Sequence, residues 1–317
     1  MPHFSVIMPL YNKASYVRKA VESVVGQTYA DWELVIVDDC STDSSGDVIA
    51  SFTDPRIRVV RLVENGGVSA ARNRGVAEST ASHICFLDAD DWWEPTFLGE
   101  MAGLIERHPD AGIYGTGYYI VKNGKKRIAP IGVDSDLKEG EINYCQVYAK
   151  TLCMPLTSIS VCIPRTIFDE AGRFPVGIKL GEDFLLWIHV ALKHKVVLLN
   201  KPLSNYNQDV DVTYRGTHHL HAPREHMLWN LGDMEPYEKT HQDYKQLIDN
   251  LRTYGLLPYL LEDEYRMTAK KELAKVNWAL QSTKTQRLYR KPIIFLKIRT
   301  RLLKAGSKIK QNVLRHV

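Results

Sequence analysis

The sequence has no long apolar run. No stretch approaches the ~20 consecutive apolar residues that a membrane-spanning helix needs, so we do not expect a transmembrane protein. The chain also opens without the basic residues and apolar core of a secretory signal, which favours a cytoplasmic protein. It contains neither an internal repeat nor a low-complexity segment, so repeat architectures are not expected either.

Cysteine is scarce as well. The five cysteines are odd in number and show no paired or metal-like spacing. This pattern predicts reduced thiols in a cytosolic setting rather than a disulfide framework. Cys85, Cys153 and Cys162 stand in apolar runs, where we expect them to pack in the core.

Apolar residues are nevertheless plentiful enough for a large core. At 317 residues with 44% hydrophobic content, the chain fits one large domain, or one domain with an appendage. Its first 90 residues alternate short apolar runs with helical patterns. We expect strands at 4–8, 32–37, 57–62 and 83–87, and helices at 16–27, 41–52 and 68–79. Short connections between such elements predict an α/β fold with a mostly parallel, doubly wound sheet and helices on both faces.

Ligands bind such sheets at the carboxyl ends of the strands. The residues at those ends supply an aromatic ring, amide and carboxylate oxygens, and glycines that permit close backbone approach: residues 9–12 (PLYN), 38–39 (DD), 65–67 (NGG) and 88–91 (DADD). This combination predicts a nucleotide pocket.

The last of these segments carries three carboxylates. Side chains two residues apart in an extended segment point the same way, so Asp88 and Asp90 can converge at the strand end. Carboxylates gathered there suit a hard divalent cation that keeps open positions for phosphate oxygens. Taken alone, this tetrapeptide is more often a solvated acidic turn, and only the upstream pattern favours the metal site.

The second half of the chain is less regular. We expect a helix at 95–108, strands at 113–121, 158–163 and 196–199, and a helix that opens at Glu182. Residues 125–127 (KKR) read as a solvated turn. From Asn205 onward the pattern changes to a polar loop followed by long helices.

Five segments, in order, resemble the family 2 glycosyltransferases: residues 6–12 (VIMPLYN), 35–43 (VIVDDCSTD), 67–73 (GVSAARN), 87–91 (LDADD) and 181–187 (GEDFLLW). The resemblance covers residues 4–205. It implies a GT-A fold, a nucleoside-diphosphate sugar donor, a Mg²⁺ or Mn²⁺ ion, and inversion at the anomeric carbon. It also implies a transferase domain at 1–205, with a nucleotide-binding half at 1–91 and an acceptor half at 92–205. Residues 206–317 would form a loop and a helical C-terminal extension.

The resemblance assigns roles on the donor side. It places the metal ligand at Asp90 and the ribose contact, or an ion-orienting group, at Asp88. Asp91 would be an outer partner of the ion or an acceptor contact, with a helix-initiating carboxylate as the alternative. The remaining donor contacts would be made by Tyr11 against the base, Pro9 beneath it, Asp39 and Asn65 at the base edge, with uracil favoured, and Arg72 on the base or phosphates, unless Arg72 is a surface arginine.

On the acceptor side the expected general base is Asp183. Inversion by single displacement requires a base that takes the proton of the acceptor hydroxyl as the new bond forms. Glu182 would bond the acceptor or brace Asp183, and Trp187 would offer a flat face to a sugar or pack in the core. The alternative for Asp183 and Glu182 is a helix N-terminus whose dipole favours two acids.

A histidine-containing loop spans residues 209–221. Such a loop often closes over the donor in this fold, so His218, His219 or His221 would touch the metal or the donor. A hydrophilic surface loop is the preferred interpretation, because no fixed ligand spacing is visible.

These features predict an inverting, metal-dependent transfer of a sugar, most simply from a UDP-sugar, to a saccharide or lipid-linked saccharide. Three alternatives stay open: transfer to a polyprenyl phosphate, a nucleotidyltransferase that makes sugar nucleotides, and an inactive scaffold. The nucleotidyltransferase would carry a Gly-rich basic loop where residues 9–13 read PLYNK. The sequence names neither the sugar nor the acceptor.

Charge is unevenly distributed. Residues 273–317 contain 12 Lys or Arg and no acid, while the rest of the chain has 29 Lys or Arg against 37 Asp or Glu. Between 291 and 308, apolar and basic residues recur at helical spacing, which predicts an interfacial helix drawn to anionic headgroups. We therefore expect peripheral attachment to the cytoplasmic face of a membrane and no nucleic-acid binding. A helix packed on the body or a partner-binding arm is the alternative.

Overall fold

The computed structural model describes residues 3–210 and 220–298 and divides into two compact units. Unit 1 is Met1–Tyr237 and unit 2 is Glu238–Val317. The boundary lies beyond the one predicted at residue 205. The last strand of the sheet runs to Asn207, and the backbone of Lys179 and Leu180 donates to the Glu225 carbonyl, so the segment after that strand stays with unit 1.

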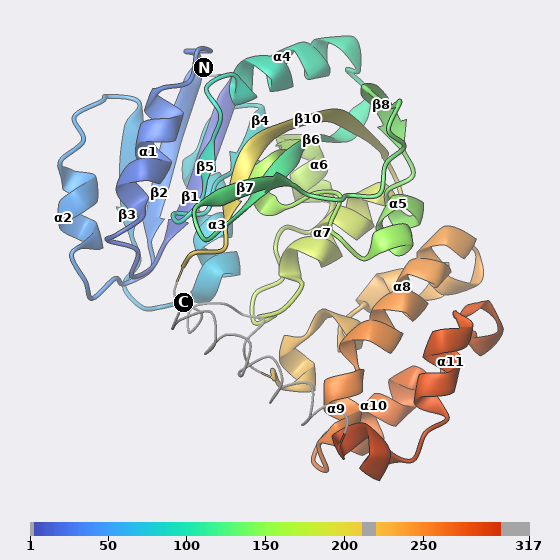
Figure 1. The fold of residues 1–317 in the computed structure, drawn as a ribbon. Coiled ribbons are helices and arrows are strands. Elements are labelled where there is room, and N and C mark those ends of the chain that lie inside the picture. Colours follow the sequence, from blue (N-terminus) through green and yellow to red (C-terminus); the bar gives the residue numbers. More distant parts are fainter. Residues whose placement is uncertain (1–2, 211–219, 299–317) are drawn as a thin grey trace. The chain divides into compact units, whose positions relative to one another are not determined.

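Unit 1 is built on a single mixed sheet (Figure 1). Its strands are β1 (Phe4–Leu10), β2 (Trp32–Asp38), β3 (Ile57–Arg61), β4 (His83–Phe86), β5 (Trp92–Trp93), β6 (Ala111–Lys122), β7 (Lys125–Ile128), β8 (Glu139–Ile142), β9 (Val161–Pro164) and β10 (Lys195–Asn207). The main order is β3-β2-β1-β4-β9-β6-β10-β5, with β7 paired to β6 and β8 to β10. Neighbouring strands among β1 to β4 are parallel, as are β6 and β10, whereas β9 is antiparallel to both of its neighbours. The predicted mostly parallel sheet is confirmed.

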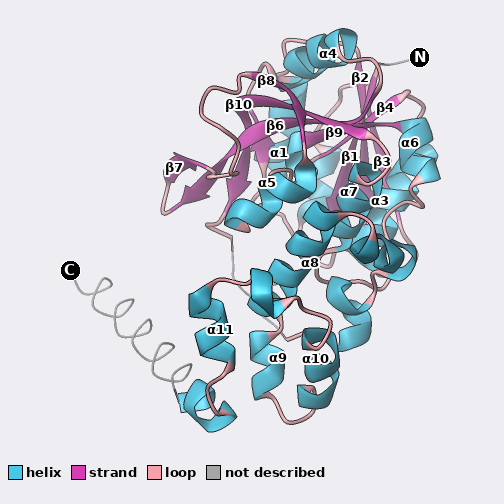
Figure 2. Ribbon diagram, turned by 90° about the vertical axis from the view of Figure 1, so that its right-hand side faces the viewer, coloured by secondary structure: helices cyan, strands magenta, loops and turns pink. Residues whose placement is uncertain are grey.

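Helices cover both faces of this sheet, because alternate strand residues point to opposite sides. On one face, Phe4, Val6 and Met8 of β1 join the core cluster that includes the buried stripe of α1 (Val17–Val25). On the other face, Gly75 of α3 (Gly67–Glu78) packs directly over Ile7. The other helices of unit 1 are α2 (Ser45–Ala50), α4 (Phe97–Arg107), α5 (Tyr144–Thr151), α6 (Arg165–Glu170) and α7 (Glu182–Ala191), seen from a second side in Figure 2.

The first four strands and their helices match the predicted pattern, but the second half differs in several places. The strand predicted at 158–163 starts only at Val161, since Ser158–Ser160 form a 3₁₀ turn capped by Thr157. The strand predicted at 196–199 continues as β10 to Asn207 through register shifts on both sides of Pro202. Residues 125–127, expected as a solvated turn, lie in the exposed strand β7 (Lys125–Ile128). Cys85 and Cys162 are buried as expected, whereas Cys153 is only partly buried.

Unit 2 is helical, with α8 (Gln242–Gly255), α9 (Leu257–Leu261), α10 (Arg266–Leu273) and α11 (Thr283–Tyr289). Among the described residues of unit 2 the helices are shorter than predicted, and the 14-residue α8 is the longest of them. Leu257 and Pro258 start α9 directly after α8, and a proline fits a first helical turn but not a helix interior. In the part of the chain that the structure describes, no helix has the length and apolarity to cross a bilayer.

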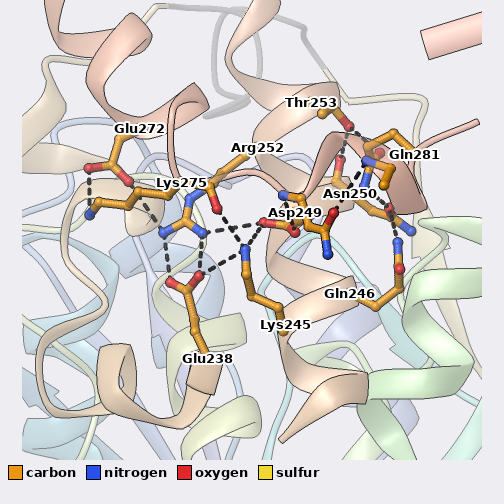
Figure 3. A network of polar contacts seen from close by, with 12 residues as sticks. Glu238, Lys245, Gln246, Asp249, Asn250, Arg252, Thr253, Glu272, Lys275 and Gln281 are labelled. Carbon is orange, nitrogen blue, oxygen red and sulfur yellow. Dashed lines mark hydrogen bonds and ion pairs between the residues drawn. The ribbon is translucent and has the colours of Figure 1, made fainter. Parts of the chain in front are cut away.

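An ion-pair network holds unit 2 together (Figure 3). The fully buried Arg252 donates two hydrogen bonds to the Glu238 carboxylate, at 2.6 and 2.7 Å, and lies 3.3 Å from a Glu272 oxygen. Lys245 pairs with Asp249 and with Glu238 at 3.3 Å. A buried guanidinium needs such partners, because an unpaired charge in the interior is strongly destabilising.

Candidate active site

A cavity of about 520 Å³ opens in unit 1 at the carboxyl ends of β1, β2 and β4 and the N-terminus of α7. All predicted site residues but one line it: Pro9, Tyr11, Asp39, Asn65, Arg72, Asp88, Asp90, Asp91, Glu182 and Asp183. The β-α repeat thus brings together side chains that are up to 174 positions apart in the sequence.

The loop after β1 presents Tyr11, whose side chain is 43% exposed at the cavity. Asn12 adopts a left-handed conformation with φ 52°, and its amide oxygen accepts hydrogen bonds from the backbone of Thr42 at 2.8 Å and Asp43 at 3.3 Å. These hydrogen bonds fix the loop after β1 to the loop after β2, and Asn tolerates the left-handed conformation that they require better than most residues. Tyr11 is therefore held where a flat ring can stack on it.

Two adjacent aspartates end β2 and have different environments. Asp38 is fully buried and accepts from the Ser41 backbone at 2.9 Å and from Arg61 at 3.1 Å, so it caps the sheet end. Asp39 accepts from the backbone N–H groups of Gly66 at 2.7 Å and Gly67 at 2.8 Å, where α3 begins. This fixes Asp39 in the wall of the cavity, while its reading of a base edge stays a prediction.

Arg72 is a buried link between two elements rather than a surface arginine. Its side chain is 3% exposed and pairs with Asp88 at 2.8 Å and with Glu182 of α7 at 3.2 Å. Although burial alone lowers the pKa of a guanidinium, these two carboxylates raise the pKa of Arg72 above its usual value. Glu182 is thus tied to Arg72, and its predicted contact with the acceptor or with Asp183 stays a prediction. The guanidinium places a fixed positive charge in the lining of the cavity.

Asp90 and Asp91 are adjacent in the sequence but also have different environments. The Asp90 carboxylate, 18% exposed, pairs with the Lys13 ammonium at 2.6 Å. Asp91 is 2% exposed and accepts from the Asn207 backbone at 2.7 Å, which fastens the end of β10 to this loop. Burial, followed by the charges of Asp90 and Asp88, raises the pKa of Asp91 well above its usual value. No helix begins at Asp91, because α4 starts at Phe97.

The donor set for a divalent ion is sparse. Within residues 3–210 and 220–298, no three His, Cys, Asp or Glu side chains are grouped as a complete metal site. Among the carboxylates that line the cavity, Asp88 is 31% exposed and Asp90 18%, and both follow strand β4. One or two carboxylates fit Mg²⁺ or Mn²⁺, which commonly take phosphate oxygens and waters as their other ligands.

Asp183 lies in the first turn of α7 and faces the same cavity. One of its oxygens is 3.3 Å from the Ser158 hydroxyl, and the other accepts from the Phe184 backbone at 2.9 Å. Burial raises the pKa of Asp183 to about 7, and the neighbouring Glu182 charge adds to the increase while Arg72 opposes it. This carboxylate therefore titrates where a base can work near neutral pH.

The prediction that Trp187 binds an acceptor sugar is wrong. Its ring is fully buried and lies against Phe86 and Phe174, with centroids 6.2 and 5.8 Å away. Helix α7 starts at the cavity and leads into the core, so a residue four positions beyond Asp183 lies roughly 6 Å deeper along the axis. His218 and His219 lie outside the described residues, and His221 does not line the cavity.

Sequence reasoning missed several lining residues. Lys13 is the most important, and its place directly after the segment 9–12 was the available signal for a cation at the strand end. Others come from the irregular second half and had no such signal: Met154, Thr157, Ser158, Lys179, Tyr206 and Asn207.

Comparison with known proteins identifies relatives of this chain. Residues 5–156 match the model of the family described as glycosyl transferase family 2. Glycosyltransferase GlyA of Streptococcus pneumoniae serotype 4 is 31% identical over 64% of this chain, but the chain spans 30% of the length of GlyA. An Escherichia coli relative, UDP-Glc:alpha-D-GlcNAc-diphosphoundecaprenol beta-1,3-glucosyltransferase WfgD, is 28% identical over 62% of this chain and 72% of its own length.

Among solved structures, S. aureus TarS 1-349 in complex with UDP-GlcNAc superposes with a TM-score of 0.72. It covers 93% of this chain and 87% of the TarS chain at 20% identity, which shows a shared fold. The family match identifies a glycosyl transferase family 2 domain at residues 5–156, in a chain that has a fold of the GT-A type.

Proposed function

We propose that this glycosyltransferase moves a sugar, with inversion, from a UDP-sugar to a hydroxyl of a saccharide or lipid-linked saccharide. The observation that carries the proposal is the position of Asp183 in the wall of the cavity, with its pKa raised to about 7. The donor class is supported by WfgD, whose name specifies UDP-Glc, and by TarS, whose structure contains UDP-GlcNAc.

On this proposal, Tyr11 stacks on the base and Asp39 and Asn65 bound its edge. Arg72 and Lys13 supply positive charge to the diphosphate side of the cavity. Asp90, assisted by Asp88, would hold Mg²⁺ or Mn²⁺, which when bound neutralises charge on the leaving nucleotide. Such an ion would take the place that the Lys13 ammonium has on Asp90.

Asp183 acts on the acceptor. The acceptor hydroxyl donates its hydrogen bond to Asp183. The proton passes to this carboxylate as the oxygen bonds to the anomeric carbon and the bond from that carbon to the UDP phosphate oxygen breaks. The Ser158 hydroxyl donates to the carboxylate at 3.3 Å and helps to orient it. A base with pKa near 7 is about half unprotonated at neutral pH and is still basic enough to accept the proton late in the step.

A donor panel tests the proposal. The purified protein is incubated with UDP-, GDP- and dTDP-sugars, with and without Mn²⁺, and release of each nucleotide is measured. We expect release from a UDP-sugar that depends on the added ion. Release from GDP- or dTDP-sugars alone would refute the donor assignment, and equal release in a chelator would refute the metal requirement.

We also infer that the protein attaches peripherally to the cytoplasmic face of a membrane, beside a lipid-linked acceptor. Support comes from the acid-free basic segment 273–317 and from WfgD, whose named acceptor is a diphosphoundecaprenol. Of the predicted interfacial helix at 291–308, residues 293–298 are helical, with Ile294, Phe295 and Ile298 exposed, and the rest lies outside the described residues. Deletion from Thr285 onward should release the protein from anionic liposomes and leave nucleotide release intact. Equal binding by the truncated chain would contradict the attachment.

A polyprenyl phosphate acceptor remains the second candidate. The same basic segment favours it, since a phosphate acceptor is itself anionic. Product analysis separates the two: a sugar joined to phosphate is released by mild acid, whereas a glycoside between sugars resists it.

A further inference from the structure

Unit 2 contains a second cavity, of about 650 Å³, which has no part in the proposed transfer. It lies among α9, α10, α11 and the segment that follows α11. Its floor is apolar, with Leu260, Leu273 and Leu296 buried, and aromatic rings line it at Trp278 and Tyr289. A hollow of this size with an apolar floor favours a ligand that has an apolar part.

Cations line the same cavity. Lys270, Arg290 and Lys291 contribute to its wall, and no Asp or Glu does so among the described residues. Some other basic residues of this unit are paired, such as Lys275 with Glu272 at 3.0 Å and Lys297 with Asp263 at 3.2 Å. By contrast, none of the three lining cations forms an ion pair within residues 220–298, and Lys291 lies only over the Phe295 ring, 5.5 Å from its centroid. The cavity therefore combines an apolar floor with uncompensated positive charge.

Apolar side chains continue outside the cavity. Ile294 is 70% exposed, Phe295 48% and Ile298 53%, directly after the residues that line the wall. Exposed apolar residues gathered beside a cationic wall are typical of a surface that meets the headgroup region of a bilayer.

We propose that this cavity binds one anionic glycerophospholipid of the membrane. The headgroup phosphate would lie against Lys270, Arg290 and Lys291, and an acyl chain would cover Leu260, Leu273 and Leu296. A free phosphate would leave the apolar floor uncovered, and an apolar peptide would leave three cations unpaired, so a ligand with both properties matches best. The proposal rests on the inferred membrane attachment and adds to it a defined lipid site.

Binding of a short-chain lipid below its micellar concentration tests the site by calorimetry on the full chain. The probes are dioctanoyl phosphatidylglycerol, dioctanoyl phosphatidylcholine, inorganic phosphate and undecaprenyl phosphate in nanodiscs. We expect one phosphatidylglycerol per chain and much weaker binding of the other three. Equal binding of phosphatidylcholine or of phosphate alone would overturn the proposal, as would preference for undecaprenyl phosphate, which would make the cavity an acceptor site.

Three variants locate the binding. Lys270→Gln/Arg290→Gln/Lys291→Gln removes the cations of the wall and should weaken phosphatidylglycerol binding about 100-fold, at ~1 kcal/mol per basic residue. Ala274→Trp keeps all charges but fills the cavity, which Ala274 lines, and should also abolish binding. The matched control Lys271→Gln/Lys284→Gln/Arg287→Gln removes as much charge from exposed positions outside the cavity and should bind like the unmodified chain.

Vesicle sedimentation separates this proposal from the attachment on which it rests. If the unmodified chain binds anionic vesicles but not the short-chain lipid, or if the cavity variants bind it as well as the control, the lipid site is refuted and attachment stands. If the unmodified chain binds no anionic vesicle, both are refuted. Nucleotide release by every variant reports that the catalytic unit is folded.

Discussion

The raised pKa of the Asp183 carboxylate lowers the stability of the fold, but the proposed reaction requires it. Folding encloses it beside Glu182, so its pKa rises from the usual value of 3.8 to about 7. A carboxylate whose pKa is raised on folding lowers stability as pH rises from its unfolded pKa toward its folded pKa. Such a cost is expected where a group must take up a proton near neutral pH.

Replacement of Asp183 by Asn keeps the shape and removes the basicity. We expect turnover to fall by ~10²-fold or more, while UDP-sugar affinity stays near normal. The pH profile of kcat/KM should rise through about 7 in the unmodified enzyme, because the base must be unprotonated. This rise should be absent from the residual activity of the variant.

Two controls accompany this variant. Asp183→Asn should be relatively more stable than the unmodified protein at pH 8 than at pH 4, since only the unmodified chain buries a charge at the higher pH. Ser158→Ala removes a hydrogen bond to the carboxylate and should shift the pH profile to more alkaline values without abolishing turnover. Near-normal turnover in Asp183→Asn would show that the base lies elsewhere.

Asp90→Ala should abolish the metal dependence of donor binding. Asp90 is the principal protein ligand of the proposed ion, so its loss removes a large share of the protein ligands. Calorimetric titration with UDP in the presence and absence of Mn²⁺ measures the effect. Asp38→Asn is the control, because Asp38 caps the sheet end and does not line the cavity. Unchanged UDP affinity with an unchanged Mn²⁺ effect in Asp90→Ala would sink the assignment.

At this scale, ten of the eleven site residues predicted from the sequence line the cavity, chiefly because strand periodicity predicts which positions lie at strand ends. It did not predict their partners. The pairing of Lys13 with Asp90 joins residues 77 positions apart, and the pairing of Arg72 with Glu182 spans 110. Such contacts depend on the exact placement of one element against another, which periodicity alone does not specify.

At the scale of elements, the position of α3 decides where Arg72 lies. The helix packs closely on the sheet through Gly75, where an added Cβ would overlap Ile7 Cγ2 and lie 3.1 Å from Val37 Cγ2. Close packing at this point brings the first turns of α3, and with them Arg72, toward Asp88.

The substitutions Gly75→Ala and Gly99→Ala should change stability in opposite directions. Both glycines are inside helices, so alanine gains roughly 1 kcal/mol of helix propensity at each. At Gly75 overpacking costs roughly 1–3 kcal/mol, and the net effect should be destabilising. At Gly99 the nearest atoms to a new Cβ are 3.9 Å away, so the gain should remain. Urea unfolding measures both, and a stabilised Gly75→Ala variant would contradict the packing argument.

Several features of unit 1 differ from the prediction, and each difference has a physical cause. The 3₁₀ turn Ser158–Ser160 follows from side-chain bonds between Thr157 and Ser160, which compete locally with an extended conformation. The long strand β10 passes Pro202 because it is joined to β6 by irregular register on both sides of that residue. Trp187 lies about one helical turn beyond Asp183, as predicted, but α7 leads from the cavity into the core, so the Trp187 ring is buried. The 3₁₀ turn therefore follows from local hydrogen bonds, whereas tertiary contacts decide the course of β10 and the burial of Trp187.

At the scale of the whole molecule, charge and stability are organised differently in the two units. Unit 2 contains the basic segment 273–317. It also contains an internal network in which Arg252 pairs with Glu238, Asp249 and Glu272. Within residues 220–298, the cations that line the cavity of unit 2 form no ion pair, whereas Arg252 in the interior is paired. The interior network therefore serves the fold, and the unpaired cations are available for an external anion.

Removal of Arg252 tests whether unit 2 depends on this network. Arg252→Met leaves buried carboxylates without their partner, which should cost about 3–5 kcal/mol of unfolding free energy. The matched control Lys297→Met breaks an ion pair in which Asp263 is 77% exposed, and such exposed pairs contribute about 0–1 kcal/mol. Thermal unfolding followed by circular dichroism should show a large loss for Arg252→Met and little change for the control. UDP binding, which depends on unit 1, should persist at temperatures below the first transition. A variant as stable as the control would show that the network is dispensable.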